Sequence, residues 1–233
     1  MSHEPRAKGQ QPKASASLRC YNLRAMSKTR ARRIKLILMD VDGVLTDGTI
    51  WLFPAPAGAP QQTASDAAAR ADSGGFAISS ANMVEAKGFH AHDGTAISLA
   101  RLAGIKTGVI TKRISETVAL RARDLRLDHV HQGAADKVAV LEQILAAEKL
   151  TAAEVAYVGD DIIDLPVMRR CGLATATANA RKEVKKEAHF VTRHAGGAGA
   201  ARDVIEYILR AQGKWESVLQ AYLGERVPSR KRP

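Results

Sequence analysis

The sequence predicts an α/β fold built on a doubly wound parallel sheet. Short apolar runs alternate along the chain with longer segments of helical period, which is the pattern of successive βαβ units. The 233 residues are 45% hydrophobic, which is enough to bury one substantial α/β core. The sequence carries no internal repeat. We therefore expect a single sheet with helices on both of its faces.

The first strand is expected at 34–39, because this apolar run is too short for a lone helix and is rich in Ile and Leu. Further strands of the sheet are expected at 105–110, 128–131, 155–158, 173–177 and 189–192. Helices are expected at 95–103, 115–125, 136–149, 165–170, 181–187 and 200–212. Ser115 and Asp136 are plausible helix starts, because their side chains can accept hydrogen bonds from unpaired N–H groups of the first turn.

Two aspartates separated by one residue follow the first strand. Asp40 and Asp42 come at its carboxyl end, where open α/β sheets bind ligands, and alternate residues of an extended chain face the same side. Gly43 then lets the backbone turn away. One carboxylate can act as a nucleophile while the other moves a proton. The alternative is a loop whose acids only cap or solvate the strand end.

Three further segments carry polar groups that suit a phosphoryl-transfer site. Thr111 follows the strand at 105–110, Lys137 opens a helical segment, and Asp160 follows the strand at 155–158. Two more acids, Asp161 and Asp164, come directly after Asp160. The alternative for Lys137 is a solvated lysine, although a helix start is an unfavourable place for a cation.

The segments DVDGVLTDG, ITKR, GAADK and GDDIIDLPVM together resemble the four motifs of the haloacid dehalogenase superfamily of phosphatases. The resemblance spans roughly residues 34–213. More narrowly, FHAHDG, HFVTRHAGGAGAARDV and RAQGKWE are similar to the 3-deoxy-D-manno-octulosonate 8-phosphate phosphatase family. The resemblance implies a Rossmann-like phosphatase core at 34–213 with a projecting β-hairpin and no large cap domain.

The resemblance also implies a mechanism that the residue chemistry favours. Asp40 would attack phosphorus, and Asp42 would protonate the leaving oxygen and then activate water. Mg²⁺ would be held by the Asp40 and Asp160 carboxylates and the Asp42 carbonyl. Lys137 and Thr111 would stabilise charge on the transferring group.

Asp161 and Asp164 are predicted to orient the metal ligands without binding the metal themselves. For Asp164 the alternative is that it caps the following helix. Four glycine-rich positions, 196–199, could cradle an anion at the next helix or form a plain turn.

The predicted substrate contacts follow from the resemblance, and Arg is well suited to grip a sugar-acid carboxylate. They are Asp42, Gly43, His90, Asp93, Gly94, Arg113, Arg121 and Lys137. Four positions depart from the family, which has arginine or glycine where this chain has His92, Ser98, Lys112 and Ala198. A nonulosonate 9-phosphate or a broad range of sugar phosphates therefore remains an alternative substrate, and a non-catalytic binding module is the alternative from another class.

The formal net charge of +11 lies in the two ends of the chain. Residues 1–33 contribute +8 and residues 225–233 contribute +3, so the segment between them is neutral overall. We expect a basic, flexible N-terminal arm at 1–33 and a C-terminal helix with a basic tail at 214–233, and we do not expect a nucleic-acid partner. Met26 is an alternative start.

The segment 54–81 is rich in Ala, Ser, Gly, Pro and Gln and separates two apolar pieces at 49–53 and 83–89. We expect a flexible loop at the tip of a hairpin. The resemblance implies a homotetramer in which this hairpin and the C-terminal segment help to close a neighbouring active site. The two distant cysteines favour a reduced cytoplasmic protein, and no apolar run approaches the roughly 18 residues of a membrane span.

Overall fold

The computed structural model describes residues 27–56, 76–77 and 83–224. Its centre is a parallel sheet of six strands in the order β10-β9-β8-β1-β5-β7. The strands are β1 (Leu36–Met39), β5 (Lys106–Ile110), β7 (His129–His131), β8 (Val155–Gly159), β9 (Leu173–Ala176) and β10 (Phe190–Val191). β1 pairs with β5 on one side and β8 on the other, and all four of its residues are buried. The predicted α/β parallel sheet is confirmed.

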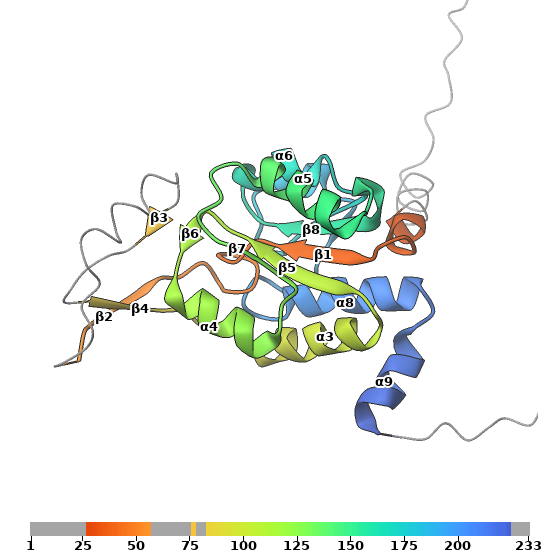
Figure 1. The fold of residues 1–233 in the computed structure, drawn as a ribbon, viewed down its shortest axis with the longest axis horizontal. Coiled ribbons are helices and arrows are strands. Elements are labelled where there is room, and N and C mark those ends of the chain that lie inside the picture. Colours follow the sequence, from red (N-terminus) through yellow and green to blue (C-terminus); the bar gives the residue numbers. More distant parts are fainter. Residues whose placement is uncertain (1–26, 57–75, 78–82, 225–233) are drawn as a thin grey trace, which may run out of the picture.

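Helices cover both faces of the sheet, as Figure 1 shows. The helices are α3 (Ala91–Leu102), α4 (Glu116–Leu125), α5 (Lys137–Glu148), α6 (Leu165–Met168), α7 (Lys182–Glu187), α8 (Ala200–Ala211) and α9 (Trp215–Leu223). Short 3-10 turns, η1 (Ala152–Glu154) and η2 (Ile162–Asp164), stand before and after β8. The described residues contain no large cap domain and no helix long and apolar enough to cross a membrane.

The alternation of side chains along β1 divides the core into two layers. Ile37 and Met39 pack in the layer that contains α3, α8 and α9, whereas Leu36 and Leu38 pack in the layer that contains α5, α6 and α7. This division follows from the two-residue period of a strand. Because both faces of β1 are covered, its carboxyl end is held rigidly between the ends of β5 and β8.

Helices begin where the sequence predicts if a strong N-cap residue is present. Ser115 accepts a hydrogen bond from the Val118 N–H before α4, and Asp136 accepts from the Val138 and Ala139 N–H groups before α5. The prediction was wrong for the start of α3, which begins at Ala91 rather than at residue 95. The cap there is His90, whose Nδ1 accepts from the backbone of His92, and histidine is not one of the usual capping residues.

The expected hairpin is present as β2 (Trp51–Pro54) paired antiparallel with β4 (Met83–Ala86). A second small sheet pairs β3 (Phe76–Ala77) in parallel with β6 (Arg113–Ile114). Residues 57–75 and 78–82, most of the predicted flexible loop, lie outside the described residues. The same holds for most of the predicted N-terminal arm and for the tail at 225–233.

Candidate active site

Asp40 lies directly at the end of β1 and is only 4% exposed. Its backbone N–H donates to the Val158 carbonyl of β8, which continues the parallel pairing by one residue. The chain then turns sharply, because the N–H groups of Val44, Leu45 and Thr46 all donate to one carbonyl, that of Val41. The tight turn keeps Asp40 and Asp42 beside the ends of the neighbouring strands.

Gly43 is required in this turn. It has a φ of +87°, and an added Cβ would lie 2.1 Å from the Asp160 Oδ2. Only glycine adopts that conformation without strain and also leaves room for the carboxylate. The sequence therefore brings the loop after β1 and the loop after β8 into direct contact.

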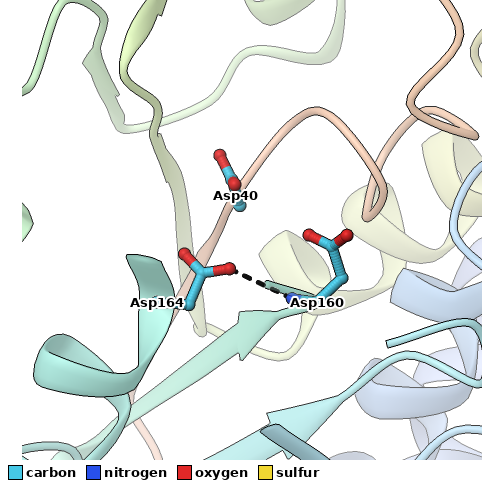
Figure 2. Close-up of side chains that lie close together, drawn as sticks. All are labelled: Asp40, Asp160 and Asp164. Atoms are coloured by element: carbon cyan, nitrogen blue, oxygen red, sulfur yellow. Dashed lines mark hydrogen bonds between the residues drawn. The ribbon is translucent and has the colours of Figure 1, made fainter. Parts of the chain in front are cut away.

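Three carboxylates converge at this edge of the sheet, as Figure 2 shows. Asp40 follows β1, Asp160 follows β8 and Asp164 ends η2, and each offers an oxygen within 4.8 Å of the others. Burial, followed by the nearby charges of Asp164 and Asp40, raises the pKa of Asp160 to about 7. Burial also raises the pKa of Asp40 to about 6, although Lys137 opposes the shift. Three crowded carboxylates favour a bound cation.

The residues present fit a magnesium ion. The Asp160 Oδ1 is buried and has no hydrogen-bond partner among the described residues. Buried polar atoms rarely lack a partner, and a carboxylate oxygen left in this way is suited to a metal. Hard oxygen donors, with no sulfur or imidazole among the three, are the ligands that Mg²⁺ prefers.

Lys137, the first residue of α5, is buried between two of these acids. Its Nζ lies 3.0 Å from the Asp40 Oδ1 and 2.8 Å from the Asp164 Oδ1. Burial opposes the charge, but Asp40 and Asp164 outweigh it and raise the pKa of the ammonium group. The alternative of a solvated lysine is wrong. A buried charge held this closely is positioned to fix the Asp40 carboxylate.

Asp164 is completely buried and accepts four hydrogen bonds. Its Oδ1 accepts from Lys137 and from the Tyr157 hydroxyl, at 2.9 Å from the latter, and its Oδ2 accepts from the backbone of Asp160 and Asp161. It makes no side-chain cap on α6, so the capping alternative is wrong for that helix. The contacts hold both Lys137 and the Asp160 loop in place.

Tyr157 is a residue of this site that the sequence analysis missed. It is fully buried in β8, and its hydroxyl lies 3.1 Å from the Lys137 Nζ. A tyrosine hydroxyl in the interior needs a polar partner, so a tyrosine two residues before the GDD segment was the available signal.

Asp42 is held by two cations from different elements. Its Oδ1 accepts from the Lys87 Nζ at 2.5 Å, and its Oδ2 accepts from the Arg113 Nε at 3.0 Å. The Lys87 side chain is 0% exposed and lies also 3.6 Å from Glu85, which in turn accepts from the Ser115 hydroxyl. The sequence analysis missed Lys87, because nothing local to residue 87 indicates that Asp42 lies beside it.

A cavity of about 380 Å³, named here the main cavity, connects these groups. It is lined by Asp40, Asp42, Thr111, Lys112, Arg113, Asp160, Asp161 and Ile163. The Thr111 hydroxyl accepts the Arg113 N–H and keeps its own proton to donate. Asp161 also accepts the Ile162 N–H at the start of η2. The structure thus brings together the predicted nucleophile, acid, hydroxyl and metal ligands.

The other predicted substrate contacts lie outside this cavity. His90 caps α3, and Asp93 accepts the Arg202 N–H near the start of α8 at 2.8 Å. Arg121 reaches Gly94, where an added Cβ would lie 2.8 Å from its Nη2, and it pairs with Asp124. These residues form a separate group around the start of α3, and their contact with substrate stays a prediction.

The glycine-rich segment 196–199 packs on the turn after β1. The Gly196 N–H donates to Asn179, the Gly197 N–H donates to the Val44 carbonyl, and Asn179 also donates to the Gly43 carbonyl. Because these N–H groups are already paired, the segment supports the turn at Gly43, and the anion cradle considered from the sequence is not supported at these two residues.

Comparison with known proteins places this geometry in a family. Residues 110–203 match the model of the haloacid dehalogenase-like hydrolase family. The chain is 36% identical over 204 residues to the 3-deoxy-D-manno-octulosonate 8-phosphate phosphatase KdsC of Escherichia coli K12, covering 87% of this chain and 94% of that protein. It is 35% identical over 187 residues to the same-named protein of Yersinia pestis, covering 80% of this chain and 86% of that one.

Comparison with solved structures indicates the same family. The Yersinia pestis 3-deoxy-D-manno-octulosonate 8-phosphate phosphatase superposes with a TM-score of 0.68 at 34% identity, covering 82% of this chain and 89% of that one. The Moraxella catarrhalis enzyme, solved with a magnesium ion, a phosphate ion and KDO, gives a TM-score of 0.69 at 28% identity, covering 84% and 97%. The chain therefore belongs to the haloacid dehalogenase-like hydrolases and, within them, to the family of 3-deoxy-D-manno-octulosonate 8-phosphate phosphatases.

Proposed function

We propose that this protein is a Mg²⁺-dependent phosphomonoesterase that hydrolyses 3-deoxy-D-manno-octulosonate 8-phosphate to the free sugar acid and phosphate, a step of lipopolysaccharide precursor synthesis. The observation that carries the proposal is the buried Asp40 carboxylate, held 3.0 Å from Lys137 in a cavity that Asp42 shares. The names of the relatives described above support the substrate.

In the first step, an Asp40 oxygen attacks phosphorus and forms an aspartyl phosphate, while the bond from phosphorus to the sugar oxygen breaks. Asp42 donates a proton to the departing oxygen. In the second step, Asp42 takes a proton from water as that water attacks phosphorus, and the Asp40 carboxylate is restored. Lys87 and Arg113 keep Asp42 oriented for both transfers.

Two further groups stabilise the charge that develops on the phosphoryl oxygens. Lys137 supplies a buried ammonium, and Thr111 supplies a hydroxyl proton at the end of β5. The Asp40 and Asp160 carboxylates and the Asp42 carbonyl would hold the Mg²⁺, with Asp161 and Asp164 orienting them. Once bound, Mg²⁺ would reduce the repulsion between the anionic Asp40 and a phosphate dianion.

We further propose a homotetramer and a cytoplasmic location. The hairpin exposes Trp51, Leu52, Phe53 and Val84, with exposed fractions between 40% and 56%. Trp51, Phe53 and Val84 share one face of the hairpin, because Phe53 pairs with Val84 and alternate residues of a strand face the same side. An exposed apolar patch on a soluble protein commonly marks an interface. In a tetramer, the hairpin and the C-terminal segment would help to close a neighbouring active site. A cytoplasmic location is supported by the buried, unpaired thiol of Cys171.

The test is phosphate release from 3-deoxy-D-manno-octulosonate 8-phosphate, with and without Mg²⁺, beside a nonulosonate 9-phosphate and glucose 6-phosphate. We expect preference for the octulosonate ester, loss of activity in EDTA, and a loss of at least about four orders of magnitude in Asp40→Asn. Preference for the nonulosonate ester, or similar rates on all three, would replace the proposed substrate. No release from any ester would leave a binding module.

A further inference from the structure

Lys112 lies between two neighbouring cavities. It lines the main cavity around Asp40, and it also lines a second cavity of about 250 Å³, named here the side cavity. Ile163 is shared by both cavities in the same way. The remaining walls of the side cavity are Ala135, Asp136, Lys137, Val138 and Pro166. Lys112 and Ile163 therefore stand between the main cavity and the side cavity.

The charges that line the two cavities leave Lys112 without a partner. Arg113 is paired with Asp42, and Lys137 is paired with Asp40 and Asp164. Asp160 and Asp161 also line the main cavity, but neither forms an ion pair with Lys112. Among the residues that the structure describes, no carboxylate lies within the 4.0 Å ion-pair distance of the half-buried Lys112 ammonium, and no hydrogen bond engages it.

The Asp136 carboxylate of the side cavity forms no ion pair with the Lys112 ammonium. One oxygen of Asp136 accepts the N–H groups of Val138 and Ala139 and so caps α5. The other side walls include the apolar residues Ala135, Val138, Ile163 and Pro166. An ammonium beside apolar walls attracts an anion more strongly than one in open water, because the local dielectric constant is lower.

We propose that Lys112 and the side cavity form a second anion subsite, which binds the carboxylate of the sugar-acid substrate. The proposal rests on the proposed function, in which the phosphate group of the substrate occupies the main cavity. The carboxylate lies at the other end of the substrate. The Lys112 ammonium is a compact point charge, which suits a carboxylate that approaches from more than one direction. The subsite makes the enzyme favour phosphate esters that also carry a carboxylate.

The experiment compares Lys112→Met, which keeps side-chain length without charge, and Lys112→Arg, which keeps the charge. The substrates are 3-deoxy-D-manno-octulosonate 8-phosphate, its carboxyl methyl ester and 4-nitrophenyl phosphate. We expect Lys112→Met to lose about 10- to 100-fold in kcat/KM on the octulosonate ester, mainly through KM, because a charge-assisted contact is removed. On the other two substrates the loss is at most about threefold, and Lys112→Arg recovers most of the activity.

The matched control is Lys185→Met, which changes a half-buried lysine of α7 that lines neither cavity. Equal losses by Lys112→Met on all three substrates, or an altered Mg²⁺ requirement, would overturn the subsite and assign Lys112 to the phosphoryl group or to the acidic cluster. Full activity on the octulosonate ester would also overturn it. Wild-type protein that does not hydrolyse this ester would instead contradict the proposed function.

Discussion

At the scale of single residues, the buried Lys87 ammonium holds the partly exposed Asp42 carboxylate. Asp42 can turn about its side-chain bonds, but a proton transfer needs one orientation, and the Lys87 and Arg113 contacts select it. Lys87 also contacts Glu85, so it connects the acid with the end of β4. We infer that Lys87 is a positioning residue for Asp42.

Lys87→Met should therefore lower kcat/KM on 3-deoxy-D-manno-octulosonate 8-phosphate, an alkyl phosphate, by about 10- to 100-fold. The loss on 4-nitrophenyl phosphate should be far smaller. Nitrophenolate leaves without needing a proton, and kcat/KM does not include the later hydrolysis of the aspartyl phosphate. Steady-state kinetics on both esters make the comparison. Lys106→Met, which removes a surface ion pair with Glu148, is the control and should leave both values near wild type. A loss of the same size on both esters would show that Lys87 only supports folding.

At the scale of elements, the loop before α8 supports the turn that carries the catalytic aspartates. An added Cβ at Gly196 would lie 1.9 Å from the Gly43 carbonyl oxygen, which is backbone and has no room to move. The two turns are therefore fitted to each other, and a change in one displaces the other.

We expect Gly196→Ala to lower the free energy of unfolding by about 1–3 kcal/mol and to reduce activity at the same time, because the displaced Gly43 shifts Asp42. Urea unfolding and phosphate release measure the two effects. The matched variant Gly88→Ala has nothing within 4 Å of the new methyl group, so its stability should stay near wild type. Normal activity in Gly196→Ala would contradict the coupling between the two loops.

The edge strand β7 contains two stacked histidines, with ring centroids of His129 and His131 6.2 Å apart. Burial, followed by the nearby His129, lowers the pKa of His131 below its ordinary value of 6.5. The groups around the pair are Glu148, whose carboxylate accepts from the His129 ring, and Lys106, which pairs with the same Glu148.

Folded protein thus binds fewer protons at His131 than unfolded protein between the lowered pKa and 6.5. The contribution of His131 to the free energy of unfolding is constant above pH 6.5. It decreases as the pH drops from 6.5 to the lowered pKa, and it is constant again below that pKa. We expect His131→Gln to reduce this pH dependence in urea unfolding measured from about pH 8 to about pH 5. Parallel curves for wild type and variant would show that His131 does not contribute.

At the scale of the whole molecule, the hairpin of β2 and β4 stands out from the sheet and presents its apolar side chains to solvent. Phe53 is 49% exposed and lies between Leu52 and Pro54. In the proposed tetramer this surface is covered by a neighbouring chain, and the hairpin helps to close that chain's active site. A lone chain has no covering for it among the described residues.

Phe53→Glu should convert the tetramer into smaller species and lower activity on the octulosonate ester, because a charge cannot be buried in an apolar interface without a partner. Light scattering gives the mass, expected for wild type at four times the 25.0 kDa of one chain. The control is Leu102→Glu, which places the same charge at a 53% exposed leucine of α3. A stable, active wild-type monomer would rule out the proposed assembly.

The sequence by itself determined the strands, most helices and the positions of the chemical groups. Each of these depends on local pattern: an apolar run followed by Asp40, or Asp136 placed to cap α5. Locality also explains the errors, since the start of α3 depends on His90, an uncommon cap whose bond to His92 is visible only in three dimensions. The substrate contacts at the start of α3 remain predictions for the same reason.

Only the tertiary structure decided which groups meet. Lys87 and Asp42 are 45 residues apart in sequence, and Lys137 and Asp164 are 27 residues apart, yet each pair forms an ion pair. The parallel sheet brings the ends of β1, β5 and β8 to one edge, and the side chains that project there are fixed by packing rather than by their sequence neighbours. Local pattern specifies which residues carry the chemistry, but contacts between distant segments arise only when the core closes and excludes water.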